Sequence, residues 1–186
     1  MSMLLTSWEY WEVSMIKRIL CCVETTKQAD TDYQYIRETI RHFYIEPSNI
    51  VIRPIYMESK SRYNSRSVQE QIRKQTMNST DNNIIYFIDT DDWDVSADDQ
   101  KLLDQIQEYC TMHGYDFVFF CRDVEDVYLG KRVANTEKVR AIKKFKSTHA
   151  IGSVEVKHLE GKRCQVHCSN IMNVLDKYWE RKNQNT

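Results

Sequence analysis

Several acidic side chains of this sequence stand where a short apolar run stops. The run 84–88 is followed by Asp89 and, two residues on, by Asp91. Alternate residues of an extended chain face the same way, so these two side chains can present their carboxylates together. Carboxylates this close repel each other, and a hard divalent cation such as Mg²⁺ is the usual compensation. The alternative is a solvated loop that caps the next helix, which suits Asp98 and Asp99 better than Asp89.

Two further acidic residues follow other apolar runs. Glu24 comes directly after the run 16–23, and Glu125 comes a few residues after the run 117–121. The carboxyl ends of the strands in a parallel α/β sheet form one edge, where ligands bind. We therefore expect Glu24 to lie near Asp89, and Glu125 to join them if the last strand is parallel. A solvated loop for Glu24 and a surface helix start for Glu125 are the alternatives.

A basic stretch later in the chain offers cations that could contact a phosphate. Its candidate substrate-binding residues are Lys143, Lys144 and Lys146, although such a run of charge is also typical of a solvated helix face. The formal net charge of −1 argues against a broadly basic surface that grips nucleic acid. Contact with nucleic acid should therefore come from residues 138–146 or from a second subunit.

Other kinds of chemistry find no support in the sequence. The histidines at 149, 158 and 167 lack zinc-ligand spacing with Cys164 and Cys168. The four glycines form neither a phosphate-binding loop nor a nucleophile elbow. A receiver-type domain would need a lysine at a strand end, and none stands out.

The cysteines and the apolar segments predict a cytoplasmic chain. Four of the six cysteines lie in apolar runs, and adjacent Cys21 and Cys22 would point to opposite faces of a strand. Because free cysteine is often buried, we expect reduced thiols. No stretch approaches the roughly 20 apolar residues of a membrane helix, and residues 1–14 do not resemble a secretory signal.

Hydrophobic periodicity gives the elements that position these residues. Short apolar runs at 16–23, 50–55, 84–88 and 117–121 predict buried strands, and the segments between them have helical spacing. This order predicts an α/β fold with a parallel sheet of about four strands and helices on both faces. The helix before the last strand should be capped by Ser96 and end at Gly114. The last helical pattern, 171–178, should be capped by Ser169 or Asn170.

Length and composition indicate one folded domain. The 186 residues are 41% hydrophobic and 28% charged, which suits one compact core. We expect an N-terminal extension at 1–15, an α/β domain at 16–182 and a polar tail at 183–186, with fraying from Glu180 onward. Trp8, Tyr10 and Trp11 in the extension either pack on the domain or dock a partner.

A strand that ends in Glu, and a later strand that ends in Asp-x-Asp, resemble the Toprim fold. Within that fold the chain resembles the RloB-like proteins of bacterial abortive-infection and anti-phage loci. Their Val-Cys-Glu-Gly motif is similar to Cys-Val-Glu-Thr at 22–25, with Thr25 in place of Gly, and their Asp-x-Asp to Asp-Thr-Asp at 89–91. Their Phe-Glu-x-Trp-Leu-Leu element is similar to Val-Glu-Asp-Val-Tyr-Leu at 124–129. The match covers roughly residues 17–129.

The resemblance implies a nuclease that depends on Mg²⁺ or Mn²⁺. Carboxylates of Toprim enzymes hold one or two metal ions that activate water and stabilise the leaving oxygen during phosphodiester cleavage. By resemblance, Glu24 is the general acid/base or a ligand, and Asp89 and Asp91 are metal ligands. Glu125 belongs to the same catalytic set. A lysine of 143–146 would steady the scissile phosphate.

The resemblance also implies biological partners. Several relatives are toxins that an ATPase partner holds inactive until phage infection, so we expect an ATPase partner, RNA (tRNA) or DNA as substrate, a possible homodimer and no membrane. The alternative is a Toprim-like module that has lost catalysis and binds or senses within a defence complex. The near-neutral net charge and Thr25 favour this alternative. The intact Glu and Asp-x-Asp favour the nuclease, and Mg²⁺ binding would separate the two.

Overall fold

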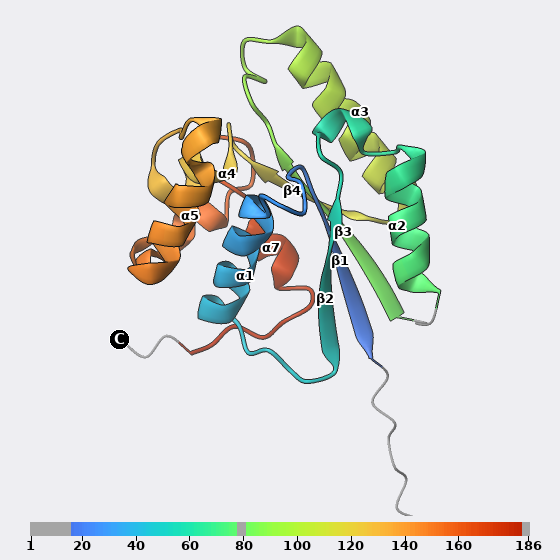
Figure 1. Ribbon diagram of the computed structural model, residues 1–186, viewed down its shortest axis with the longest axis horizontal. Helices are drawn as coiled ribbons and strands as arrows, with labels where there is room; N and C mark the ends of the chain where they lie inside the picture. The colour runs from blue at the N-terminus through green and yellow to red at the C-terminus, as the bar shows by residue number, and fades with distance from the viewer. Residues whose placement is uncertain (1–15, 78–80, 184–186) are drawn as a thin grey trace, which may run out of the picture.

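The computed structural model describes residues 16–77 and 81–183 and contains one parallel sheet (Figure 1). The predicted packing of Trp8, Tyr10 and Trp11 and most of the predicted tail lie outside the described residues. The sheet has the strand order β2-β1-β3-β4, and each neighbouring pair is parallel, as the sequence predicted. Its strands are β1 (Lys17–Val23), β2 (Ile50–Tyr56), β3 (Asp81–Asp89) and β4 (Asp116–Phe120).

Both faces of the sheet are buried, because alternate residues of the central strands enter two separate cores. In β1, Cys21 belongs to one core and Cys22 to the other. In β3, Phe87 and Ile88 divide in the same way. This double burial explains why the strands read as continuous apolar runs rather than as an alternating pattern.

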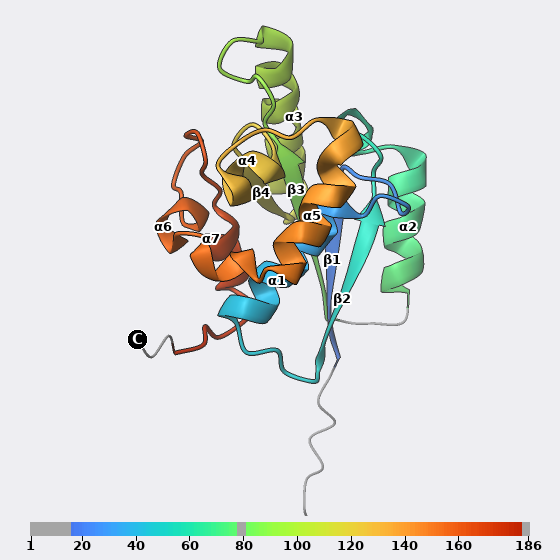
Figure 2. The ribbon, with the colours of Figure 1, turned by 60° about the vertical axis from the view of Figure 1, so that its left-hand side comes forward.

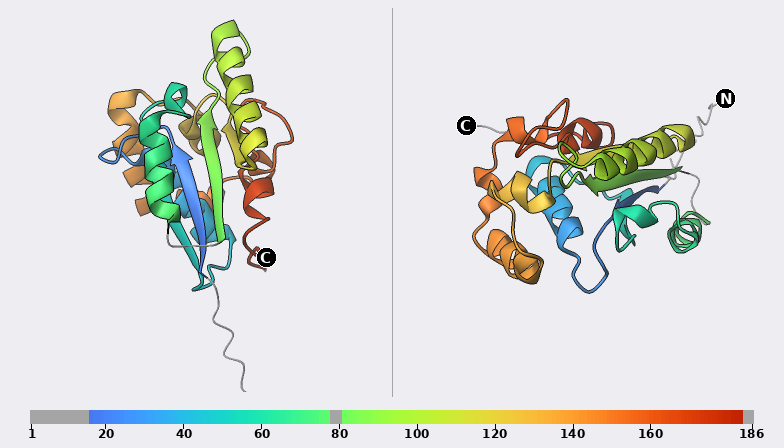
Figure 3. Two further views of the ribbon diagram at one scale, coloured as in Figure 1. Left: turned by 90° about the vertical axis from the view of Figure 1, so that its right-hand side faces the viewer. Right: turned by 90° about the horizontal axis from the view of Figure 1, so that it is seen from above.

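The helices cover the two faces unequally. Figure 3 shows α2 and α3 on one face, and Figure 2 shows α5 beside α1 on the other, where α4 and α7 also pack. The predicted final helix is shorter than its periodicity suggested, since it ends at residue 175. The helices are α1 (Thr31–Phe43), α2 (Arg66–Thr76), α3 (Ala97–His113), α4 (Val124–Leu129), α5 (Lys138–Ser147), α6 (Val156–Leu159) and α7 (Ile171–Leu175), with short 3₁₀ turns η1 (Lys60–Arg62), η2 (Asn135–Glu137) and η3 (Ala150–Ser153).

Helix α3 begins and ends where its sequence predicted. The Ser96 side chain accepts a hydrogen bond from the Asp99 amide, and Gly114 has the left-handed conformation at φ 68°. The N-terminal half of α3 extends beyond the sheet (Figure 1), so the loop from Asp89 to α3 stands above the carboxyl ends of the strands.

The segment after α6 blocks the open edge of β4. Asn170 accepts a hydrogen bond from the Phe119 amide at 2.9 Å and donates one to the Phe117 carbonyl at 3.0 Å. Asn170 therefore does not cap α7 with its side chain. Instead, its amide group satisfies backbone groups that an edge strand would otherwise leave open.

The C-terminal segment is held against the domain, contrary to the predicted fraying from Glu180. Arg181 forms ion pairs with Asp176 at 2.7 Å and with Glu160 at 2.5 Å. The Ile45 amide donates a hydrogen bond to the Glu180 carbonyl at 2.9 Å. The prediction was wrong because Glu160 and Ile45 come from other segments of the chain, where the polarity of the tail gives no sign of them.

Two of the cysteines are paired, which corrects the prediction of reduced thiols. Cys121, directly after β4, forms a disulfide with Cys164, and their Cα atoms are 5.4 Å apart. Cys21, Cys22 and Cys110 are free and buried, as predicted, and Cys168 is free and half-buried. The pairing was missed because Cys164 lies 43 residues away in a segment without clear periodicity.

Over residues 16–77 and 81–183, no helix combines the length and apolar character that crossing a membrane requires.

The disulfide predicts the outcome of a thiol titration. Protein prepared without reductant and then unfolded should show four reactive thiols, and fully reduced protein should show all six. The variant Cys164→Ser should give the same count with and without reductant. Six thiols in unreduced wild-type protein would contradict the pairing.

Candidate functional site

The carboxyl ends of β1 and β3 flank the topological switch point of the sheet. The chain passes from β1 to β2 on one side and later returns to β3 on the other, which opens a crevice between β1 and β3. Glu24 directly follows β1, and Asp89 is the last residue of β3. A pocket of about 390 Å³ lies there, and Glu24, Asp32, Asp89 and Lys138 help to line it. We call it the carboxylate pocket.

Glu24 is held in place by two backbone amides. Its Oε1 accepts a hydrogen bond from the Asp89 amide at 2.8 Å, and its Oε2 accepts one from the Lys60 amide at 3.2 Å. Burial raises the pKa of Glu24 to about 8, and repulsion from Asp32 adds to the shift. This carboxyl group can therefore exchange a proton near neutral pH.

Asp89 and Asp32 bring two more carboxyl groups to the pocket. Asp32 lies in the first turn of α1 and is buried, with only 4% of its surface exposed. Burial raises its pKa to about 6, and repulsion from Glu125 adds to the effect. The pKa of Asp89 is raised well above its usual value by burial and then by repulsion from Asp32 and Glu24. The carboxyl groups of Glu24, Asp32 and Asp89 therefore ionise together only with difficulty, unless a cation binds between them.

Glu125 does not line the pocket, but it forms an ion pair with Lys138, which does. Glu125 belongs to α4 and is fully buried, so the surface position considered from the sequence is wrong. Its Oε2 lies 2.8 Å from Nζ of Lys138. Burial works to lower the pKa of Lys138, but attraction to Asp89 and contact with Glu125 outweigh it and raise the pKa. Lys138 therefore stays positively charged between the two carboxylates.

Asp91 is brought to the same edge but is already paired with cations. Its Oδ2 forms a short ion pair with Nζ of Lys60, and its Oδ1 lies 4.0 Å from Arg132. The Lys60 ammonium also donates to the Asp89 carbonyl at 3.2 Å and approaches Asp99 at 3.4 Å. Burial works to lower the pKa of Lys60, but its contacts with Asp91 outweigh it and raise the pKa.

The lysines selected from the sequence lie outside the carboxylate pocket. Lys143 and Lys144 are exposed on α5, and the Lys146 ammonium donates to Oε1 of Gln34 at 3.2 Å. None of the three is among the residues that line the pocket, whereas Lys138 of the same helix is. Their contact with a substrate remains a prediction.

Sequence reasoning missed Asp32 and Lys60. Asp32 sits at the start of a helix, where an acidic residue usually interacts with the helix dipole in solvent. Lys60 lies in a polar segment after β2, and its side chain becomes buried only through tertiary contacts. For Lys60, its position in the turn that closely follows β2 was the available signal.

The chemistry of the pocket fits a divalent cation, although no ready-made site is present. Among residues 16–77 and 81–183, no group of three or more His, Cys, Asp or Glu side chains is placed as around a metal ion. Burial, and then repulsion within the acidic cluster, raise the pKa values of Glu24, Asp32 and Asp89, so a cation in the pocket would favour their ionised forms. Oxygen ligands of this kind suit Mg²⁺ or Mn²⁺.

Comparisons with known proteins do not assign the chain to a family. No protein-family model, no curated protein and no solved structure gives a significant match. The resemblance to Toprim and RloB-like proteins therefore rests on the short motifs alone.

The raised pKa values predict that stability falls as pH rises. The folded protein retains protons on Glu24, Asp32 and Asp89 that the unfolded chain releases, so the free energy of unfolding should decrease from about pH 4.5 to about pH 8. Asp89→Asn should flatten this decrease, because it removes one of the mutually repelling charges. Urea unfolding at a series of pH values measures the effect.

The exposed Asp98, in the first turn of α3, provides a matched control. Asp98→Asn should leave the slope unchanged. Adding Mg²⁺ at pH 8 should stabilise wild-type protein more than Asp89→Asn if the pocket binds the ion. A flat pH profile for the wild type would contradict the mutual repulsion of the buried carboxyl groups.

Proposed function

We propose that the carboxylate pocket is the active site of a metal-dependent phosphodiesterase that cleaves RNA, such as tRNA, or DNA. The observation that supports this most is the convergence of Glu24, Asp32 and Asp89 at the switch point of a parallel sheet. By resemblance to RloB-like Toprim proteins, the biological role would be that of the toxin in an anti-phage defence system.

The residues of the pocket suit distinct parts of such a reaction. Glu24, Asp32 and Asp89 would hold Mg²⁺ or Mn²⁺, and a bound ion would supply charge stabilisation and an activated water. With a pKa of about 8, Glu24 could alternatively act as the general acid or base. Lys138 lines the same pocket and can orient a phosphate oxygen.

Asp91 and Glu125 would contribute through their partners. Asp91 belongs to the predicted ligand set, but its ion pair with Lys60 would have to open before it could bind a metal ion. Glu125 would position Lys138 rather than touch the substrate, since it is fully buried. A substitution of Asp89 is therefore a more direct test of the catalytic role of this pocket than a substitution of Asp91 or Glu125.

The setting of the reaction is part of the same proposal. The ATPase partner is proposed from the resemblance. A cytoplasmic location is proposed because tRNA and DNA are intracellular substrates. The Cys121–Cys164 disulfide does not favour a cytosolic location, because glutathione and thioredoxin keep most cytosolic thiols reduced.

A binding or sensing subunit is the second candidate. It is favoured by the ion pairs of Asp91 and by the two backbone amides that occupy the oxygens of Glu24, because both arrangements resemble structural roles. This candidate predicts metal or nucleic-acid binding without cleavage.

Cleavage assays with purified protein can separate the two candidates. Labelled tRNA, single-stranded DNA and plasmid DNA should be incubated with the full chain and Mg²⁺ or Mn²⁺. We expect cleavage that stops when the metal is chelated. Glu24→Gln and Asp89→Asn should each lower the rate by about 100-fold or more, as expected for the loss of an acid/base or charge-stabilising group.

Asp98→Asn is again the control, and its rate should equal that of the wild type. Circular dichroism should show that the inactive variants remain folded. Metal-dependent cleavage that persists in Asp89→Asn would reject this site. Intact substrates under every condition, with bound Mg²⁺ or nucleic acid, would favour the binding subunit.

A further inference from the structure

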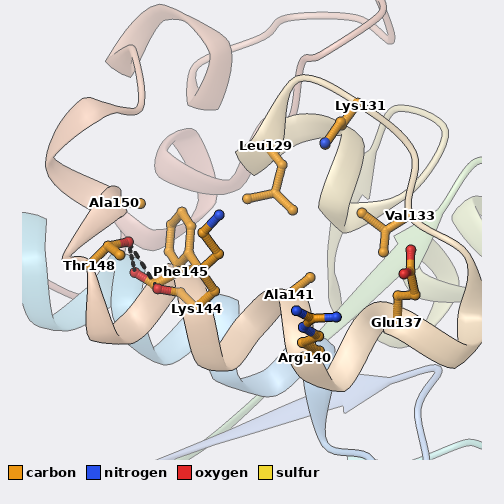
Figure 4. A pocket seen from close by; sticks show the side chains of 10 residues that line it. All are labelled: Leu129, Lys131, Val133, Glu137, Arg140, Ala141, Lys144, Phe145, Thr148 and Ala150. Atoms are coloured by element: carbon orange, nitrogen blue, oxygen red, sulfur yellow. Dashed lines mark hydrogen bonds between the residues drawn. The ribbon is translucent and has the colours of Figure 1, made fainter.

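A second pocket lies on the opposite side of α5 from the carboxylate pocket. It has a volume of about 390 Å³. Figure 4 shows Leu129 and Val133 on one side of it and Ala141 and Phe145 of α5 on the other. Phe145 is almost fully buried, and the other three are half-buried, so together they form an apolar floor. We call it the α5 pocket.

Three cations surround this apolar floor without acidic partners. Lys131, Arg140 and Lys144 line the pocket and are exposed. Their side chains form no ion pair or hydrogen bond with another described residue. By contrast, Lys60 and Lys138 are each paired with carboxylates. With three cations and one carboxylate, that of Glu137, in its lining, the α5 pocket has an excess of positive charge that an anionic ligand can neutralise.

One carboxylate in the pocket restricts which anionic ligands could bind there. Glu137 lines the same pocket, is exposed, and has no partner for its side chain among the described residues. A carboxylate only accepts hydrogen bonds, so it suits hydroxyl or amino groups of a ligand and would repel a second phosphate beside it. Inorganic phosphate alone would use neither Glu137 nor the apolar floor.

We propose that the α5 pocket binds one nucleoside phosphate. The phosphate would contact the cations, the sugar or base would donate to Glu137, and the face of the base would cover the apolar floor. The volume lies at the lower end of the range of about 300–1,000 Å³ that is usual for small-molecule sites, which suits a single nucleotide unit. The unit could be a free nucleotide or one residue of a single-stranded nucleic acid.

The two pockets are joined through adjacent residues of the chain. Glu137 lines the α5 pocket, and Lys138, the next residue, lines the carboxylate pocket. A nucleic-acid strand that crossed the first turn of α5 could therefore place one nucleotide in the α5 pocket while a more distant phosphate approaches Lys138. The inference goes beyond the proposed cleavage, because nucleotide binding at this pocket requires neither metal nor catalysis.

Binding should be measured on the full chain carrying Asp89→Asn, with EDTA present, so that neither cleavage nor metal can influence the result. The probes are the nucleoside 5′-monophosphates, short single-stranded oligonucleotides and inorganic phosphate. Calorimetry measures the affinity of each. Nucleotides or oligonucleotides should bind at least about tenfold more tightly than phosphate. Tight binding of mononucleotides identifies a free nucleotide as sufficient, and binding of oligonucleotides alone identifies a unit of a chain.

Variants locate the binding. On the same background, Arg140→Gln combined with Lys144→Gln should weaken binding by about tenfold or more, since charge-assisted hydrogen bonds are lost. Ala141→Phe should do the same by filling the pocket. Lys101→Gln removes an exposed charge from α3, outside this pocket, and should change affinity by less than about twofold.

Three results would overturn the proposal. They are equal affinity for phosphate and nucleotides, no binding of any nucleotide or oligonucleotide, and unchanged affinity in both the Arg140/Lys144 double variant and Ala141→Phe. Circular dichroism of each variant excludes unfolding as the cause of lost binding. Because Asp89→Asn is the common background, loss of cleavage and loss of nucleotide binding are measured separately.

Discussion

Repulsion among buried carboxylates is the constraint around which the carboxyl edge of the sheet is built. A parallel sheet places the carboxyl ends of all its strands on one edge, where Glu24 directly follows β1 and Asp89 is the last residue of β3. Helix α1 adds Asp32 to the same small volume. Since burial and mutual repulsion both disfavour ionisation, these groups either keep protons or require a cation. Positive charge at this edge therefore stabilises the ionised carboxylates.

Two lysines from different elements supply part of this positive charge. Lys60 in η1 pairs with Asp91, and Lys138 at the start of α5 pairs with Glu125. Both have raised pKa values despite burial, because the surrounding carboxylates favour the charged form. The same contacts fix the loop after β3 and the first turn of α5. The ion pairs of Lys60 and Lys138 thus both compensate the negative charge and hold the segments that border the pocket.

Helix α5 connects this edge to the rest of the surface. Its buried face packs Ile142 and Phe145 into the core that α1 shares, while Lys138 reaches the carboxylate pocket. Arg140 and Lys144 face the second pocket without acidic partners. One amphipathic helix can therefore present paired charge to the sheet edge and unpaired charge to solvent. A polyanion that crossed the first turn of this helix would meet both pockets.

The sequence determined much of the fold and part of the site. Continuous apolar runs specify doubly covered strands, and their alternation with helical periodicity leads to a parallel sheet. Strand-end position then brought Glu24 and Asp89 together correctly. The cap at Ser96 and the end at Gly114 were predictable because such signals act within a few residues.

Only the tertiary structure decided which charges face one another. Asp32 and Lys60 resemble ordinary surface residues in sequence, yet packing buries both beside the strand ends. The disulfide between Cys121 and Cys164 and the ion pair of Arg181 with Glu160 likewise join different segments of the chain. Local periodicity and propensity depend on near neighbours, whereas ion pairs, pKa values and pockets depend on groups that meet only after the chain has folded.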